Sequence, residues 1–298
     1  MMEKKHKSGF VNIVGNPNVG KSTLMNRLVG ERISIITSKA QTTRHRIMGI
    51  VNTDDMQIVY SDTPGVLHPN YKLQESMLNF SESALGDADV LLYVTDVIEK
   101  IDKNEEFLQR VQKVKDYPVL LLINKIDQTN QADLEKLVAQ WKELLPDAEI
   151  IPISALSNFN IDYVKQRVAE LMPESPPYFE KDALTDKPAR FFVTEIIREK
   201  ILLYYQKEIP YSVEVVVELF KEDDEKIHIK ALIIAERDSQ KGIIIGHRGQ
   251  ALKKVGAMAR KDIERFFEKK VFLEIFVKVE KDWRNRDNML KAFGYQLD

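Results

Sequence analysis

The sequence predicts two domains of different class: an α/β domain with a mostly parallel sheet and helices on both faces, then a smaller α+β domain. Up to residue 173, short and continuously apolar runs alternate with longer amphipathic segments, as in parallel strands joined by helices. Residues 173–188 contain four prolines, which favours an extended linker over 174–188. The remaining pattern is helix, two strands, two helices, strand and helix. The 298 residues suffice for two domains, 1–173 and 189–298.

The expected elements follow this pattern in chain order. The first domain should contain six apolar strands, near Phe10–Val14, Ile47–Val51, Gln57–Ser61, Val90–Thr95, Val119–Ile123 and Ile150–Ile153. Its amphipathic helices should lie near Lys21–Leu28, Leu73–Gly86, Asn104–Lys115, Gln131–Leu145 and Ile161–Leu171. The second domain should have strands at Ser212–Phe220, Lys226–Glu236 and Phe272–Val279, and helices at Ala189–Tyr205, Ile243–Phe267 (a glycine-interrupted pair) and Lys281–Ala292. Mostly parallel sheets, such as the one expected in the first domain, bind ligands at the carboxyl ends of their strands.

Composition excludes some classes of protein. The chain has no cysteine, so it has no disulfide framework and no cysteine-based metal site. A net charge of −2 argues against an indiscriminate nucleic-acid binder, but residues 237–291 hold 15 basic and 8 acidic residues, net +7. The N-terminus offers no apolar stretch for a signal peptide or a membrane span, so we expect a cytoplasmic protein.

A glycine-rich segment, GNPNVGKS, follows the first apolar run and opens a helix, which is the context of a phosphate-binding loop. Its glycines let backbone amides turn toward phosphate oxygens, and the helix N-terminus adds positive charge. Lys21 would contact the β- and γ-phosphates, and the Ser22 hydroxyl would bind Mg²⁺. The candidate residues are Gly15, Asn16, Pro17, Asn18, Val19, Gly20, Lys21, Ser22 and Thr23.

A second motif, Asp62, Thr63, Pro64 and Gly65, ends the run Gln57–Ser61. Asp62 would sit near the magnesium ion, and Gly65 would offer its amide to the γ-phosphate. The next residue is Val66, at a position where many GTPases have a glutamine that orients water. Since valine cannot hydrogen-bond water, we expect slow intrinsic hydrolysis unless another group positions the water.

The third motif, Asn124-Lys125-Ile126-Asp127, closes the run Val119–Ile123. Guanine presents donors at N1 and N2 where adenine presents none, so a carboxylate at Asp127 would select GTP over ATP. Asn124 would brace the loop and Lys125 would lie along the base. The segment Ser154, Ala155 and Leu156, after Ile150–Ile153, would support the base with a backbone amide.

Between the first two motifs lies a polar segment, Ser38–Arg44, of the kind that closes on Mg²⁺ and γ-phosphate. Thr43 is the expected magnesium ligand, with Thr42 as the alternative. Arg44 and Arg46 are the candidates for stabilising charge in catalysis, but we expect surface residues on a mobile loop in preference to that role.

The second domain contains Gly246-His247-Arg248-Gly249 after an apolar run and before a basic helix. Such a GXXG loop clamps a single-stranded nucleic-acid backbone, because its glycines permit close approach and its basic residues meet phosphates. Ile243, Ile244, Ile245 and Leu252 would floor a groove for bases. The candidate RNA-binding residues are Ile245, Gly246, His247, Arg248, Gly249, Lys253 and Arg284. Trp283 would either stack on RNA or anchor the last helix.

Across its whole length the sequence resembles the Era family of bacterial ribosome-assembly GTPases. The resemblance lies in GNPNVGKSTLMNRL, KAQTTRHR, DTPG, NKID, SAL and GIIIGHRGQALK, in this order, and in the fusion to a C-terminal type II KH domain. It implies binding to the 3′ end of 16S rRNA, a role in 30S subunit maturation and peripheral membrane association. It also implies that Asn18 coordinates a potassium ion, and it agrees with an apolar residue at Val66.

The sequence therefore predicts a monomeric GTPase that uses GTP/GDP, Mg²⁺ and K⁺, with Lys21, Thr43, Gly65 and Asn18 supporting catalysis. Two alternatives stay open: a non-catalytic RNA-binding scaffold stabilised by nucleotide, which Val66 favours, and a GTPase coupled to modification of another RNA.

Overall fold

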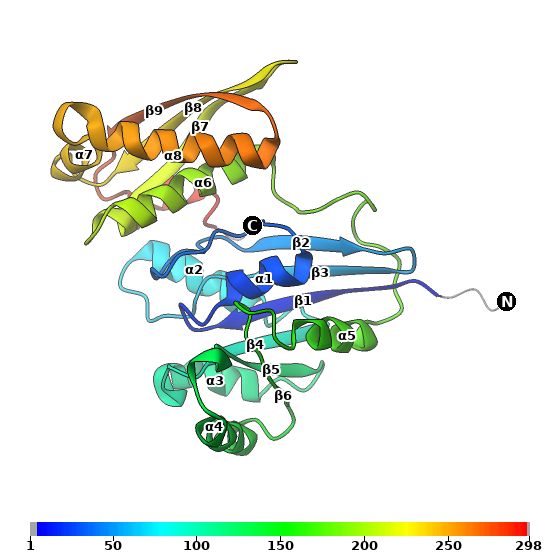
Figure 1. Ribbon diagram of the computed structural model, residues 1–298. Helices are drawn as coiled ribbons and strands as arrows, with labels where there is room; N and C mark the ends of the chain where they lie inside the picture. The colour runs from blue at the N-terminus through cyan, green and yellow to red at the C-terminus, as the bar shows by residue number, and fades with distance from the viewer. Residues whose placement is uncertain (1–4, 297–298) are drawn as a thin grey trace.

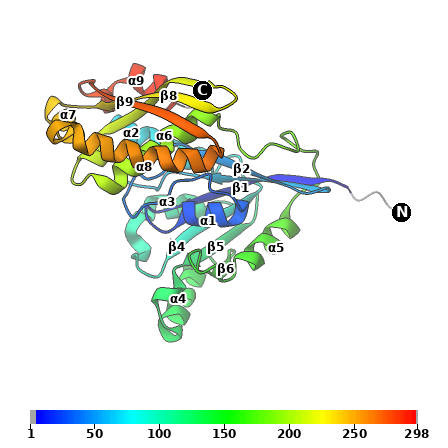
Figure 2. The same ribbon diagram turned by 45° about the horizontal axis from the view of Figure 1, so that its top comes forward.

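The structure of the protein is a computed structural model that describes residues 5–296, so residues 1–4 and 297–298 at the predicted domain ends lie outside the described residues. Figures 1 and 2 show a large α/β unit with a smaller unit stacked on it. Within residues 5–296, none of the helices combines the length and apolarity that a membrane crossing requires.

The large unit is built on six strands in the order β2-β3-β1-β4-β5-β6. They are β1 (Lys7–Gly15), β2 (Ile47–Asn52), β3 (Met56–Asp62), β4 (Val90–Asp96), β5 (Val119–Asn124) and β6 (Glu149–Pro152). All neighbours pair parallel except β2 with β3, which pair antiparallel. The turn between β2 and β3 is too short for a parallel crossover, which needs a dozen or more residues. The sheet is therefore mostly parallel, as predicted.

Helices cover both faces of this sheet. They are α1 (Lys21–Val29), α2 (Lys72–Ser83), α3 (Glu105–Gln112), α4 (Gln131–Leu144) and α5 (Ile161–Leu171). One core cluster joins apolar residues of α1 and α5 to the sheet, and another joins those of α3 and α4 to its other face. Strand β4 is buried along its whole length, and its first five residues, Val90–Val94, are apolar without alternation, as expected for a strand covered on both faces.

The small unit follows the predicted order of elements. It contains α6 (Ala189–Tyr204), β7 (Val213–Glu222), β8 (Lys226–Ala235), α7 (Asp238–Ile245), α8 (Gln250–Phe267), β9 (Lys270–Val279) and α9 (Asp287–Ala292). Strand β8 pairs antiparallel with β7 and parallel with β9. Short 3₁₀ turns lie at Ile101–Asn104, Ile126–Gln128, Ile209–Tyr211, His247–Gly249 and Trp283–Asn285.

Two expected helices have different limits. Helix α7 begins at Asp238 rather than Ile243, because the Gln240 side chain accepts hydrogen bonds from the backbone amides of Glu236 and Arg237 and so caps a polar first turn. The expected helix Lys281–Ala292 is a 3₁₀ turn and then α9, interrupted at Arg286, whose backbone is extended.

The segment predicted as a linker contains no helix or named strand, but it is bound to the large unit. The amide of Ile50 donates to the carbonyl of Leu184 at 2.8 Å, and Gly49 pairs with Thr185. These contacts cover β2, the edge strand of the sheet, and so protect an edge that would otherwise expose unpaired backbone groups.

The two units share a buried contact. Leu73, Met77 and Phe80 of α2 form one apolar cluster with Trp283, Leu290 and Tyr295 of the small unit. Helix α6 lies between the two sheets (Figure 1). The small unit therefore packs against α2 of the large unit.

Candidate functional site

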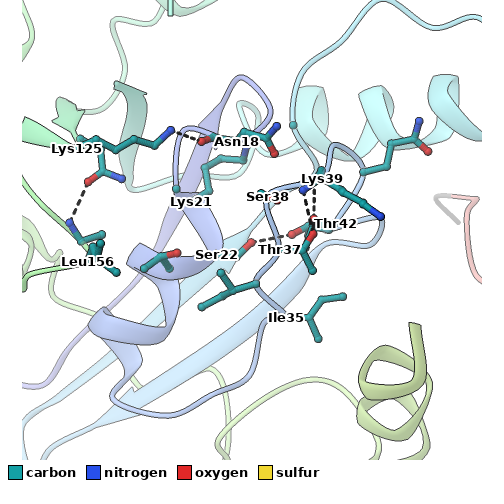
Figure 3. Close-up of a pocket in the computed structure, with 18 of the residues that line it drawn as sticks. Asn18, Lys21, Ser22, Ile35, Thr37, Ser38, Lys39, Thr42, Lys125 and Leu156 are labelled. Atoms are coloured by element: carbon teal, nitrogen blue, oxygen red, sulfur yellow. Dashed lines mark hydrogen bonds between the residues drawn. The ribbon is translucent and has the colours of Figure 1, made fainter. Parts of the chain in front are cut away.

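A pocket of about 560 Å³ opens at the carboxyl end of the large sheet (Figure 3). Its lining combines residues of the three motifs with the segment 35–43 and Leu156. This volume lies within the range of small-molecule sites. The segments predicted to bind phosphate, magnesium and base thus meet at one cavity.

The phosphate loop needs its glycines for steric reasons. Gly15 and Gly20 have φ of +148° and +99°. A Cβ on Gly15 would lie 2.1 Å from the carbonyl oxygen of Val94, and one on Gly20 would lie 2.2 Å from Nδ2 of Asn124. Other residues would strain both positions, so the chain can follow this path around a phosphate only with glycine.

Lys21 is buried beneath this loop. Its Nζ donates to the carbonyls of Gly15 (3.0 Å) and Asn16 (2.8 Å). Burial lowers the pKa of Lys21 to about 8, although the carboxylates of Asp62 and Glu99 act in the opposite direction. An anionic phosphate would restore the charge, so the site favours a polyanion over a neutral ligand.

Three oxygens meet beside Lys21. Ser22 Oγ donates to Asp62 Oδ2 at 2.8 Å and lies 2.8 Å from Thr43 Oγ1, which lies 3.3 Å from the same carboxylate. Thr42 instead bonds Thr37 and the carbonyl of Lys39. The structure therefore places Thr43, and not Thr42, beside Ser22 and Asp62.

This set of oxygens fits a magnesium ion. The second carboxylate oxygen of Asp62 is buried without a hydrogen-bond partner, and burial raises the pKa of Asp62. Mg²⁺ prefers few protein ligands and completes its shell with phosphate and water oxygens. Residues 5–296 contain no cluster of three or more His, Cys, Asp or Glu side chains that could hold a metal ion.

The second motif packs directly on the phosphate loop. A Cβ on Gly65 would lie 2.6 Å from Cα of Pro17, so this contact also needs glycine. Thr63 donates to the carbonyl of Ile13, and Pro64 accepts from Ser81. The Val66 side chain is buried in the core, while its amide donates to Gly15. Valine at this position thus fills the core and leaves the pocket free of an apolar obstacle.

The third motif is braced as predicted for a base-binding loop. Asn124 Nδ2 donates to the carbonyl of Val19 (2.8 Å), and its Oδ1 accepts from the amide of Ala155 (2.9 Å). Lys125 Nζ donates to the carbonyl of Asn18 (2.7 Å). Asp127 is exposed and accepts from Ser154 Oγ at 2.5 Å. One side chain, Asn124, therefore ties its own loop to the phosphate loop and to the segment that contains Ala155.

Three supporting side chains were not predicted from the sequence. Asn104 donates to Asn16 Oδ1 (2.7 Å) and to the carbonyl of Val66 (2.8 Å). Glu99 accepts from Asn16 (2.9 Å), and Asp96 accepts from Lys125 (2.5 Å). Asp96 ends β4 and could have been found by the strand-end rule. Asn104 carried no such signal.

The expectation for Arg44 was wrong. Arg44 is 0% exposed, and its guanidinium donates to the carbonyls of Val213 and Pro210 and to the carboxylate of Glu214. Arg46 is also held, through Ser61 and Asp87. Each of the two arginines donates hydrogen bonds to several acceptors on strands and neighbouring loops. Both side chains are therefore fixed in place.

The GXXG loop joins α7 to α8. Gly246 and Gly249 have φ of +71° and +76°, and a Cβ on Gly246 would lie 2.6 Å from that of Ala251. His247 and Arg248 are exposed, as is Lys253 on the following helix. Of the predicted apolar floor, Ile244 is buried in the core, Ile245 and Leu252 are half-buried, and Ile243 is 52% exposed. The loop presents backbone and two basic side chains to solvent.

Trp283 and Arg284 have structural contacts. Trp283 is 0% exposed and donates to the carbonyl of Ser212, so it anchors the C-terminal segment and does not offer a stacking surface. Arg284 pairs with Glu236 at 2.5 Å and lies 4.4 Å from the ring centroid of Tyr71. Arg284 is thus held by Glu236 within the small unit and by Tyr71 of the large unit, and its RNA contact stays a prediction.

Comparison with known proteins agrees with this arrangement. Residues 10–125 match a family described as 50S ribosome-binding GTPase, and residues 208–284 match the KH domain family. The chain is 44% identical over 295 residues to GTPase Era of Staphylococcus haemolyticus, covering 99% of both chains.

Solved structures of Era are similar to this chain as well. The fold matches a crystal structure of Era in complex with MgGDPNP and nucleotides 1506–1542 of 16S ribosomal RNA, with a TM-score of 0.93, 40% identity and coverage of 98% of this chain and 100% of that one. An Aquifex aeolicus Era variant bound to GDP and AlF4− matches with a TM-score of 0.92 and 40% identity, at the same coverage. From its sequence, its fold and its nucleotide pocket, the chain belongs to the Era family of GTPases.

Proposed function

We propose that this GTPase is a nucleotide-dependent switch whose KH domain binds the 3′ end of 16S rRNA, and that it acts in maturation of the 30S subunit. The observation that carries the proposal is the presence, in one compact molecule, of a guanine-nucleotide pocket and an exposed GXXG loop. The relative crystallised with MgGDPNP and nucleotides 1506–1542 of 16S rRNA supports this choice of RNA.

The pocket residues would have separate roles in GTP hydrolysis. Lys21 and the loop amides would neutralise and orient the β- and γ-phosphates, and the Gly65 amide would contact the γ-phosphate. Ser22, Thr43 and the Asp62 carboxylate would hold Mg²⁺, which when bound supplies positive charge between the phosphates. Asp127 would select guanine. Catalysis would then consist of positioning and electrostatic stabilisation.

Asn18 is proposed as a ligand of a potassium ion. It is exposed at the pocket and has φ of +66°, so its side chain lies on a tight turn near the phosphate positions. Val66 leaves no side chain there to orient water, so added positive charge would help. We expect GTP turnover to be faster in K⁺ than in Na⁺ and expect Asn18→Ala to remove the difference. Equal rates in both salts would exclude potassium.

RNA binding by the GXXG loop has a direct test. An oligonucleotide matching the 16S rRNA 3′ end is titrated against the full chain and against the double variant His247→Ala, Arg248→Ala. Loss of two basic contacts should weaken binding about tenfold or more at low salt and reduce its salt dependence. Lys142→Ala, an exposed change in the large unit, is the control. Equal affinity of all three proteins would refute the proposed RNA site.

A cytoplasmic location with peripheral contact to the membrane belongs to the same proposal, because the family resemblance implies it. Cell fractionation at low and high salt tests it, since a peripheral protein should leave the membrane fraction at high salt.

A further inference from the structure

We propose that Arg198, on the first helix of the KH domain, is a positioning residue for the nucleotide site, because it holds the backbone that carries Thr43. The inference rests on the proposed role of Thr43 as a magnesium ligand. It assigns the completion of the GTPase site to a residue outside the GTPase domain.

The contacts of Arg198 point to one short stretch of chain. Its Nη1 donates to the carbonyl of Gln41 at 3.1 Å, and its Nη2 donates to the carbonyl of Thr42. Its Nε and Nη2 also donate to both oxygens of Glu195, at 2.8 and 2.6 Å. Arg198 is 1% exposed, so these bonds act with little screening by water. The planar guanidinium therefore fixes two successive carbonyls directly before Thr43.

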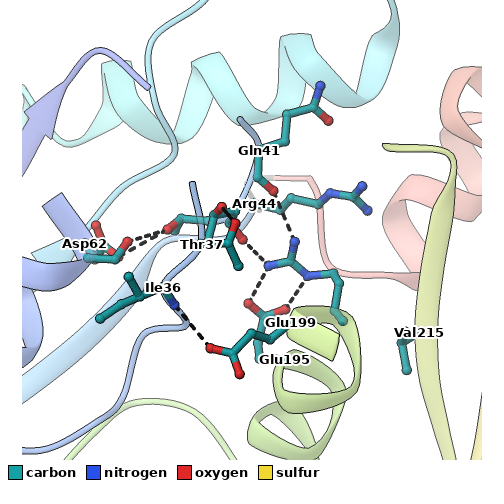
Figure 4. A network of polar contacts seen from close by, with 12 residues as sticks. Ile36, Thr37, Gln41, Arg44, Asp62, Glu195, Glu199 and Val215 are labelled. Atoms are coloured by element: carbon teal, nitrogen blue, oxygen red, sulfur yellow. Dashed lines mark hydrogen bonds and ion pairs between the residues drawn. The ribbon is translucent and has the colours of Figure 1, made fainter. Parts of the chain in front are cut away.

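The same loop is held on both sides by the KH domain (Figure 4). Before Gln41, the Ile36 amide donates to Glu199 and Lys39 Nζ donates to the carbonyl of Tyr205 at 2.5 Å. After Thr43, Arg44 is bound by Glu214, and the ring of His45 stacks on that of Tyr295 with centroids 4.3 Å apart. Each of these partners follows residue 188.

The loop has no regular secondary structure to fix its path. Residues 31–46 contain no helix or strand, so their backbone groups have no regular ladder of partners. Thr43 Oγ1 can meet Ser22 and Asp62 only if this irregular segment keeps one conformation. Arg198 supplies that constraint at the two residues before Thr43. Glu214 holds Arg44, the residue after Thr43, and the other anchors lie further from Thr43 along the chain.

A path also leads from this loop to the GXXG loop. Tyr205, whose carbonyl accepts from Lys39, donates through its own hydroxyl to the carbonyl of Ile244 at 2.6 Å. Ile244 lies in the last turn of α7, two residues before Gly246. Because coupling between binding sites is reciprocal, ordering of the loop by nucleotide and its contact with the KH domain must favour each other.

The test uses the full-length protein and two variants of the buried ion pair between Arg198 and Glu195. Arg198→Lys keeps the charge but removes the fork that reaches two carbonyls and the carboxylate together. Arg198→Met with Glu195→Leu removes the buried pair without leaving an unpaired charge. The control is Lys72→Ala, which breaks an exposed ion pair between the units, Lys72–Asp287, that does not touch the loop.

The first readout is amide hydrogen exchange of residues 37–45 without nucleotide or magnesium. Loss of a charged hydrogen bond to the loop should accelerate this exchange about tenfold in both Arg198 variants. The second is the Mg²⁺ concentration for half-maximal GTP hydrolysis, which should rise about tenfold, while GDP affinity without Mg²⁺ stays within twofold of the starting protein.

Unchanged exchange and unchanged Mg²⁺ dependence in both Arg198 variants would overturn the inference. Equal effects from Lys72→Ala would also overturn it, since any weakening of domain contact would then suffice. Thr43→Ala separates the two proposals. If it leaves Mg²⁺ dependence unchanged while Arg198→Lys still accelerates exchange, the proposed magnesium ligand is refuted and the positioning of the loop by Arg198 is supported.

Discussion

Replacing Asn124 with alanine tests how the Asn124–Asp127 loop is held to the phosphate loop and to the segment that contains Ala155. Asn124 is 3% exposed and makes two hydrogen bonds, to the Val19 carbonyl at 2.8 Å and from the Ala155 amide at 2.9 Å. The substitution leaves both backbone groups buried without a partner, at about 1–3 kcal/mol each. Allowing for partial entry of water, we expect the free energy of unfolding of the large unit to fall by about 2–4 kcal/mol.

Urea unfolding measures this change. The chain has two tryptophans, so a Trp283→Phe background leaves Trp141, buried in the large unit, as the reporter. Asn130→Ala is the matched control, because its exposed side chain accepts a cap bond from the Asp133 amide and donates to the exposed Asp133 carboxylate. It should cost about 1 kcal/mol. A loss for Asn124→Ala no larger than that of the control would refute the bracing role.

Three further predictions concern charge. Asp127→Asn should weaken GTP binding at least about tenfold and improve binding of xanthosine nucleotides; unchanged guanine selectivity in competition assays would contradict the base contact. Lys21 has a pKa of about 8 in the free protein and should be protonated when phosphate binds, so affinity for GDP without Mg²⁺ should fall roughly fourfold from pH 7 to 8.5; a flat calorimetric profile would argue against it. Burial beside Arg198 lowers the pKa of His45 from 6.5 to about 3. As the pH falls below 6.5, the unfolded chain therefore binds a proton that the folded chain does not. The free energy of unfolding should then drop by up to about 2 kcal/mol at pH 5. His45→Phe should lose less stability over that range, and an equal loss in urea titrations would contradict this.

The sequence was sufficient where function depends on local motifs. Glycines with positive φ, strand-end polar residues and the GXXG loop can be predicted, because a short segment determines their chemistry. The burial of Arg44 could not be predicted in this way. Its sequence neighbours suggest a surface loop, but its hydrogen-bond acceptors lie about 170 residues away, on and before β7. The role of Trp283 could not be predicted either. Stacking on RNA and anchoring of the last helix both fitted the local sequence, and only the packing of Trp283 against α2 decided between them.

The sequence favoured Thr43 over Thr42 as the magnesium ligand but could not exclude Thr42, for the same reason. Both are threonines in one polar loop, and the loop's conformation is set by Arg198 and Glu214 from another domain. Contacts between residues far apart in sequence leave no periodicity or spacing from which they could be predicted.

The central claim is that nucleotide state and RNA binding are coupled through the loop that carries Thr43. The most direct test titrates an oligonucleotide of the 16S rRNA 3′ end against the protein, once with a non-hydrolysable GTP analogue and Mg²⁺ and once with GDP. We expect tighter binding with the analogue, by about fivefold or more, which is the usual range of coupling between sites. Equal affinity in both states would mean that the two sites are joined in one chain but do not communicate through this RNA.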